Sequence, residues 1–171
     1  MPNAVTLRCA DADATKRFAA RLATALHPGD LIILTGELGA GKTTFTQGLG
    51  AALQVRGQIS SPTFIVAREH PAIGSGPNLV HVDAYRLGGL AELDALDLDS
   101  SLDEAVTVVE WGAGLAENLS DDHLEIEITR QRGNFTADDD PEAGERLIKL
   151  HPIGPRWAEV DLSGLTPDAL R

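Results

Sequence analysis

The sequence predicts an α/β domain, built on a mixed sheet with antiparallel strands added at one side. Short apolar runs of strand length alternate with segments whose apolar residues recur every four positions, as on one face of a helix. The last strand-like segments alternate apolar and polar residues, as antiparallel strands with one solvated face do. At 171 residues the chain has the size of one ordinary domain. We therefore expect a single domain over residues 1–171, with an unassigned tail after about residue 155.

The first half of the chain is predicted to alternate strands and helices. Residues 5–9 alternate as a strand does. A helix should follow, capped at its start by Asp11 or Asp13 and ended by Pro28-Gly29. Residues 30–36 are a continuous apolar run, which is typical of a strand that is buried on both faces.

The second half is expected to complete the sheet. Turn residues separate two strand-like segments that suggest a hairpin, and two alternating segments near the end suggest an antiparallel pair. The predicted elements are strands at 60–70 and 78–87, a helix at 89–105, a strand at 106–110, a short helix at 112–119, strands at 123–131 and 145–154, and a short helix at 166–170.

A glycine-rich loop joins the buried strand to the second helix. Residues 36–43 match G-x-x-x-x-G-K-[ST], the P-loop motif, and Phe45, Leu49 and Leu53 give the helix that should run from about Lys42. The glycines let backbone N–H groups surround phosphate oxygens, the lysine reaches the β and γ phosphates, and the threonine hydroxyl ligates Mg²⁺. The expected fold is therefore a P-loop NTPase-like three-layer domain. The expected nucleotide-binding residues of this segment are Gly36, Glu37, Leu38, Gly39, Ala40, Gly41, Lys42, Thr43 and Thr44.

Two acidic residues close apolar strands and are candidates for the magnesium site and for catalysis. Asp83 ends the segment LVHVD, and Glu110 ends VTVVE. In an open α/β sheet such strand ends lie at the ligand crevice. A P-loop site needs a second magnesium anchor besides the threonine. Spacing alone leaves open which acid holds the metal and which orients the attacking water.

Other residues are weaker candidates. Thr63, in the segment SSPTF, would sense the γ-phosphate as a switch loop does, or belong to a polar turn. Trp111 would pack beside the nucleotide or in the core. Arg86, Arg130 and Arg132 would contact phosphate or base, or form solvated ion pairs. The five histidines show no metal-ligand spacing, and we expect them at the surface or in ordinary packing.

Composition and charge limit the possible partners and location. No apolar run approaches the roughly 18 residues of a spanning helix, no secretory signal is visible, and Cys9 is the only cysteine. A cytoplasmic location without membrane contact is expected. Residues 90–145 hold 17 acids and two bases, which gives either a solvated face or a docking surface for a basic partner. Such a balance is unfavourable for direct nucleic-acid binding.

Several classes of P-loop protein compete. A small-molecule kinase usually closes an arginine-bearing lid over the transferred phosphate, but no Lys or Arg lies between Arg86 and Arg130. A GTPase should carry the N-K-x-D motif that reads guanine, and the sequence has none. An ATPase that serves a partner complex and a nucleotide-gated binding module with little hydrolysis both fit. Because the guanine-reading motif is missing, ATP is favoured over GTP as the nucleotide.

Linked motifs give the sequence a family resemblance. The segments GELGAGKTTF, SPTF, HVDAYRL followed by AEL, and VVEWG stand in one order over about residues 15–112. In this they resemble the bacterial tRNA threonylcarbamoyladenosine biosynthesis ATPase family, known as TsaE or YjeE. The family's D-L-Y-R-L is here DAYRL, which keeps Asp83, Tyr85 and Arg86.

The resemblance implies a role for each motif. It implies a Mg²⁺-dependent ATPase that assists TsaB and TsaD proteins in modifying tRNA and does not carry out the transfer itself. We expect slow turnover of the isolated chain, because no residue is an evident arginine finger. Thr43 and Glu110 would coordinate magnesium, Asp83 would support catalysis, and the segment around Thr63 would act as the switch. Trp111 matches the tryptophan of the family's E-W motif. Family members can also place a late basic residue near the nucleotide, for which Arg132 is the nearest candidate.

Overall fold

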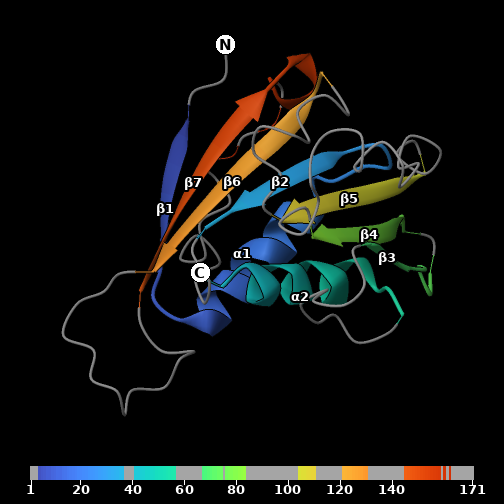
Figure 1. Ribbon diagram of the computed structural model, residues 1–171, viewed down its shortest axis with the longest axis horizontal. Helices are drawn as coiled ribbons and strands as arrows, with labels where there is room; N and C mark the ends of the chain where they lie inside the picture. The colour runs from blue at the N-terminus through green and yellow to red at the C-terminus, as the bar shows by residue number, and fades with distance from the viewer. Residues whose placement is uncertain are drawn as a thin grey trace.

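The computed structural model describes residues 4–36, 41–56, 67–74, 76–83, 104–110, 121–130, 145–158, 160 and 162. Within them, a mixed sheet of seven strands carries two helices side by side on one of its faces (Figure 1). The elements are β1 (Val5–Cys9), α1 (Ala12–Ala23), β2 (Leu31–Thr35), α2 (Lys42–Leu53), β3 (Ala67–His70), β4 (Asn78–Asp83), β5 (Ala105–Glu110), β6 (His123–Arg130), β7 (Arg146–Ile153) and the 3₁₀ helix η3 (Pro155–Trp157).

The strand order confirms the predicted mixed sheet and corrects one detail. The order is β1-β7-β6-β2-β5-β4-β3. The four central strands β6, β2, β5 and β4 are parallel to one another. Antiparallel strands are added at both edges and not at one side, because β7 and β1 extend the sheet beyond β6 while β3 forms the predicted hairpin with β4.

The core lies between the sheet and the two helices. Alternate residues of the central strands point to the helix face; Ile32, Val108 and Leu124 are in register there and have no exposed surface. Phe18 of α1 and Phe45 of α2 pack against this layer, with their ring centroids 5.8 Å apart. A continuous apolar layer of this kind supplies most of the free energy that holds the helices on the sheet.

Helix α1 starts where the sequence predicts and ends earlier. The Asp11 carboxylate accepts a hydrogen bond from the Ala14 N–H at 2.8 Å, so Asp11 and not Asp13 is the N-cap. The helix ends at Ala23, whereas the apolar pattern predicted an end at Pro28-Gly29. Leu26 is nevertheless buried. The apolar spacing predicts which residues are buried, and not whether they are helical. A residue in the segment after a helix can be buried as well.

The second face of the sheet is also buried at its centre. Leu31 and Ile33 of β2 and Val109 of β5 have no exposed surface, and they alternate with the residues that face the helices. This is the burial expected of a three-layer domain. The helices predicted at 112–119 and 166–170 lie outside the described residues, and so does the helix predicted at 89–105 as far as residue 103. The predicted end of that last helix is wrong, because Glu104 lies in a turn and Ala105 begins β5.

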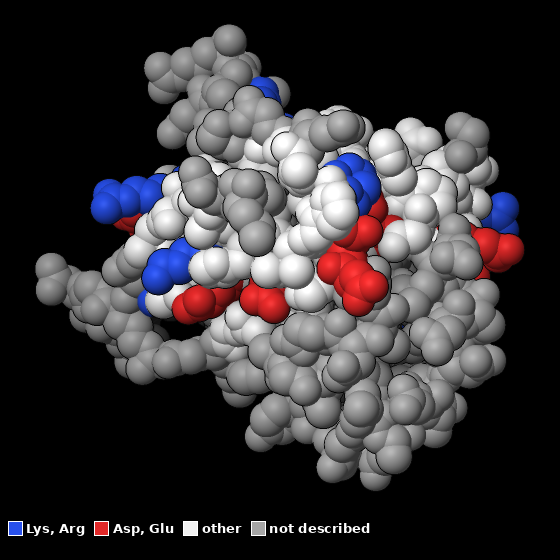
Figure 2. All heavy atoms as spheres, turned by 90° about the horizontal axis from the view of Figure 1, so that it is seen from above, with Lys and Arg blue, Asp and Glu red and all other residues white. Residues whose placement is uncertain are grey.

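The described surface carries charges of both signs. Figure 2 shows Lys and Arg side chains in small groups next to Asp and Glu side chains, separated by uncharged residues. Most of the acidic stretch at 90–145 lies outside the described residues, so neither alternative, a solvated face or a docking surface, is tested there. Among the described helices, none is long and apolar enough to cross a membrane.

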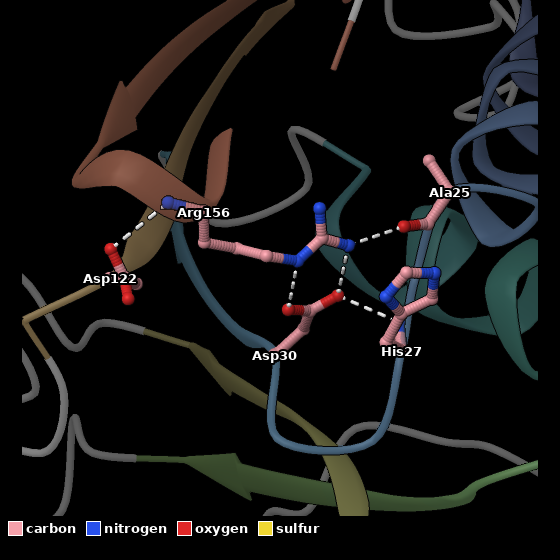
Figure 3. A network of polar contacts seen from close by, with 5 residues as sticks. All are labelled: Ala25, His27, Asp30, Asp122 and Arg156. Carbon is pink, nitrogen blue, oxygen red and sulfur yellow. Dashed lines mark hydrogen bonds and ion pairs between the residues drawn. The ribbon is translucent and has the colours of Figure 1, made fainter. Parts of the chain in front are cut away.

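The C-terminal segment is tied to the start of β2 by a polar network (Figure 3). The Arg156 guanidinium donates from Nε to Asp30 Oδ1 and from Nη2 to Asp30 Oδ2, each at 3.0 Å. It also donates to the Ala25 carbonyl at 2.6 Å, and Asp30 Oδ2 accepts from the His27 N–H at 2.7 Å. We call these contacts the Arg156–Asp30 latch. They join residues 126 positions apart, and the neighbouring Trp157 is fully buried.

Candidate functional site

The candidate site lies at the carboxyl ends of the central strands. We call this end of the sheet the P-loop edge. Because β2, β4 and β5 are parallel, their carboxyl ends meet at this edge. Leu34 of β2 is in register with Glu110 of β5, and Glu110 is in register with Asp83 of β4. The P-loop begins directly after β2, at Gly36. The fold thus brings the two predicted acids to the start of the predicted phosphate loop.

Helix α2 begins inside the P-loop motif and has no side-chain cap. Its N-cap is Gly41, which has φ of +115° and no side chain with which to cap the helix. A left-handed φ of this kind favours glycine. The first turn of α2 carries no acidic residue, whereas α1 has the Asp11 cap and Asp13. The first-turn N–H groups of an α-helix have no intrahelical partner, and a helix start without a side-chain cap suits an anion.

Lys42 contacts the first residue of the P-loop motif. Its side chain is buried, and Nζ donates to the Gly36 carbonyl at 2.7 Å. The ammonium group therefore lies beside Gly36, the first residue of the P-loop motif, where a phosphate oxygen would replace the carbonyl as its acceptor. Thr43 and Thr44 are half-buried at the same helix start.

Glu110 has a partner that the sequence analysis missed. His81 Nε2 lies 2.6 Å from Glu110 Oε2, with side-chain exposures of 1% and 5%. The expectation that the histidines are surface or ordinary packing residues is therefore wrong for His81. The two residues are 29 positions apart, so only the pairing of β4 with β5 reveals the contact.

Arg146 is a second residue that the sequence analysis did not single out. A Cβ atom placed on Gly41 would lie 3.7 Å from Arg146 Nε, so the guanidinium borders the start of α2. Arg146 is buried, at 2% exposure, and is in register with Arg130 at the end of β6. The sequence held a signal for this placement. Arg146 lies at the start of the strand predicted at 145–154, and an antiparallel partner begins where the strand beside it, 123–131, ends.

Cys9 is a buried residue next to Arg146 in the sheet. It is the register partner of Arg146 on β1 and has no exposed surface. Burial raises the pKa of the Cys9 thiol to about 11, and a hydrogen bond with Thr15 and the charges of Arg17 and Arg146 oppose that shift. The thiol therefore stays neutral and unreactive at physiological pH.

The residues at this edge fit a magnesium ion held together with a nucleotide. Among the described residues no three His, Cys, Asp or Glu side chains form a metal cluster. Mg²⁺ in nucleotide sites takes one or two protein oxygens and completes its shell with phosphates and water. Glu110 and Thr43 supply oxygens of that kind, and the backbone of Asp83 adjoins Glu110.

Some predicted site residues lie outside the described part of the chain. The structure gives no placement for Glu37, Leu38, Gly39, Ala40, Thr63, Trp111 and Arg132. For Asp83 it gives the backbone and not the side chain. The roles assigned to these residues stay predictions.

Comparison with known proteins identifies the family. The sequence model of the family described as "Threonylcarbamoyl adenosine biosynthesis protein TsaE" matches residues 9–137. The tRNA threonylcarbamoyladenosine biosynthesis protein TsaE of Streptomyces coelicolor is 55% identical over 146 residues, covering 85% of this chain and 95% of that protein. The protein of the same name from Bacillus subtilis is 36% identical over 151 residues, covering 88% and 87%.

A solved structure shares the fold. The crystal structure of Bacillus subtilis YdiB matches with a TM-score of 0.68 and 30% identity, covering 92% of this chain and 90% of that one. This match and the seven-stranded mixed sheet confirm the predicted P-loop NTPase-like fold. With three quarters of its length matched by one family model, the chain belongs to the TsaE family of threonylcarbamoyl adenosine biosynthesis proteins.

Proposed function

We propose that the chain is a Mg²⁺-dependent ATPase that supports the threonylcarbamoyladenosine modification of tRNA. The family's role in this biosynthesis is the basis of the proposal. The observation that supports the ATPase activity is that Lys42, the start of α2 without a side-chain cap, and the buried Glu110 lie at the carboxyl ends of the central strands.

In this proposal the start of α2 and the side chains of Lys42 and Arg146 bind the phosphates. The P-loop and first-turn N–H groups would donate to the phosphate oxygens, and Lys42 would exchange its bond to the Gly36 carbonyl for the β and γ phosphates. Arg146, next to Gly41, would add a further cation. These groups favour the charge that develops as water attacks the γ-phosphate in line.

The cation would be held by Thr43 and Glu110, with Asp83 beside them. When bound, Mg²⁺ would neutralise charge on the β and γ phosphate oxygens. Asp83 would hold the metal through water or orient the attacking water molecule. Replacing Glu110 by Ala should weaken Mg²⁺-dependent nucleotide binding at least tenfold. An unchanged magnesium titration would remove Glu110 from the metal site.

We further propose that turnover is slow for the isolated chain and rises with TsaB-type and TsaD-type proteins. These partners would carry the transfer chemistry, and their docking would complete the site. Thr63 would act as the γ-phosphate switch, with Trp111 and Arg132 at the nucleotide. The acidic stretch at 90–145 is the proposed docking surface, and direct tRNA binding would be weak.

Phosphate release tests the proposal. Mg-ATP and Mg-GTP are supplied to the chain alone and together with TsaB and TsaD, with Lys42→Ala as the blank. ATP-selective release that rises with the partners supports a partner-stimulated ATPase. Nucleotide binding without release under any condition would replace that function by a nucleotide-gated binding module. Phosphate transfer to a small acceptor, with no free phosphate, would indicate a kinase.

A further inference from the structure

We infer that His81 is a positioning residue, which fixes the Glu110 carboxylate for the cation of the nucleotide site. The inference rests on the proposed function and adds to it a residue outside the motifs that bind phosphate. It starts from the buried contact of 2.6 Å between His81 Nε2 and Glu110 Oε2.

The direction of this hydrogen bond follows from its chemistry. A carboxylate oxygen only accepts, so the imidazole Nε2–H donates to Oε2. A charge-assisted bond of this length belongs to the strong class. Among the described residues Glu110 makes no other hydrogen bond, so Oε2 is engaged and Oε1 is left for a further ligand.

Strand pairing explains why His81 can reach Glu110. His81 is in register with Val108, two residues before Glu110 on β5. Residues two apart on a strand share a face, so the imidazole extends diagonally along β4 and β5 to the carboxylate. Asp83, two residues after His81, is the register partner of Glu110. His81 therefore lies directly beneath the pair of acids that the proposed function assigns to the metal.

Burial gives this contact its consequence. With 5% of its side chain exposed, Glu110 has little contact with water, and a buried carboxylate is unfavourable without a hydrogen-bond partner. The His81 N–H supplies that partner and limits rotation of the carboxylate plane. Removing an outer partner of a metal ligand typically lowers metal affinity about 10- to 100-fold.

A matched pair of variants tests the inference. In His81→Gln the amide nitrogen stands close to the place of Nε2, whereas in His81→Asn the same amide is one carbon shorter and falls short of Oε2. Mn²⁺ affinity is measured by electron paramagnetic resonance in the presence of ADP. ADP affinity without metal is measured in EDTA by fluorescence of a labelled ADP, and thermal unfolding by circular dichroism checks each fold.

The expected result separates metal from nucleotide. His81→Asn should lower Mn²⁺ affinity about tenfold or more, His81→Gln should recover most of it, and metal-free ADP affinity should change less than twofold in both. Glu110→Gln gives the loss produced by removing the carboxylate charge itself. Equal Mn²⁺ affinities in the Asn variant, the Gln variant and the wild type would overturn the inference. So would equal losses of metal and metal-free nucleotide binding, which indicate general damage to the site.

A measurement on the wild type covers the case in which a variant does not fold. The ¹⁵N resonance of His81 Nε2 should shift when Mg²⁺ is added to the ADP complex. A cation bound to the Glu110 carboxylate would draw electron density from Oε2 and so weaken the hydrogen bond that Oε2 accepts from His81. A resonance that ADP shifts and Mg²⁺ leaves in place would also overturn the inference. Wild-type protein that binds neither ADP nor Mn²⁺·ADP would instead contradict the proposed function, so the two failures are distinct.

Discussion

The two ends of the sheet use buried charge in opposite ways. At the start of β2, the Asp30 carboxylate and the Arg156 guanidinium satisfy each other, and the latch is closed by the Ala25 carbonyl and the His27 N–H. At the end of β2, Lys42 bonds to a carbonyl of its own loop. Arg146 borders the uncapped start of α2 and is in register with a second arginine.

The difference separates stability from binding. A buried pair that is complete within the protein holds two segments together and has no need of a ligand. An edge that gathers cations and helix N–H groups is electrostatically suited to a polyphosphate. Substitutions in the latch should therefore lower the free energy of unfolding and leave nucleotide affinity unchanged. Substitutions at the P-loop edge should lower nucleotide affinity or hydrolysis and have a smaller effect on the free energy of unfolding.

Lys42→Ala should give the largest effect. ATP hydrolysis should fall about 100- to 1,000-fold, because the ammonium group no longer stabilises charge on the transferred phosphate. The melting temperature in the absence of nucleotide should stay within a few degrees, since the lost bond is a single contact within a loop. Phosphate release and calorimetry measure the two quantities. Activity above a tenth of the wild-type value would contradict the proposed site.

Arg156→Ala should give the largest loss of stability. It leaves the buried Asp30 without its counter-charge, and breaking such a pair from one side should cost about 2–4 kcal/mol of unfolding free energy. Urea unfolding followed by circular dichroism measures the loss.

Arg8→Ala is the matched control for the latch. The ion pair between Arg8 and Glu145 is exposed, with side-chain exposures of 77% and 42%. Its loss should change stability by less than about 0.5 kcal/mol. Equal effects of the two variants would show that the latch contributes no more than a surface pair does.

Arg146→Ala should weaken nucleotide binding about 10- to 100-fold, the range for a lost charge-assisted hydrogen bond to phosphate. Isothermal titration with ADP measures the change, and Arg8→Ala again serves as the control. Arg146→Lys keeps the charge and should recover part of the affinity. A change of less than twofold in Arg146→Ala would place the guanidinium outside the nucleotide site.

Cys9→Ala should have the smallest effect on function. The raised pKa, about 11, keeps the thiol protonated through neutral pH, so a neutral group is exchanged for a neutral group. ADP affinity should therefore match the wild type between pH 6 and 9, with a stability loss of about 1 kcal/mol for the smaller side chain. The two affinity curves would diverge as pH rises within this range if the thiol ionised there, and that divergence would contradict the raised pKa.

Short-range patterns predicted most of the fold. Strand β2, the start of α2 and the antiparallel pair of β6 and β7 follow from apolar spacing and from turn residues that lie within a few positions of each other. The early end of α1 shows the limit of such patterns, because Leu26 is buried without being helical. The P-loop itself was readable because its chemistry lies in consecutive residues.

By itself, the sequence determined the class of the domain, the phosphate loop with Lys42 and the strand-ending acids Asp83 and Glu110. Only the tertiary structure decided which distant residues meet at the two ends of the central strands. His81 reaches Glu110 through strand pairing, Arg146 reaches Gly41 across the sheet edge, and Arg156 reaches Asp30 over 126 positions. The reason is physical: local propensities fix elements from neighbouring residues, whereas contacts between elements depend on strand order and register, which the whole core selects.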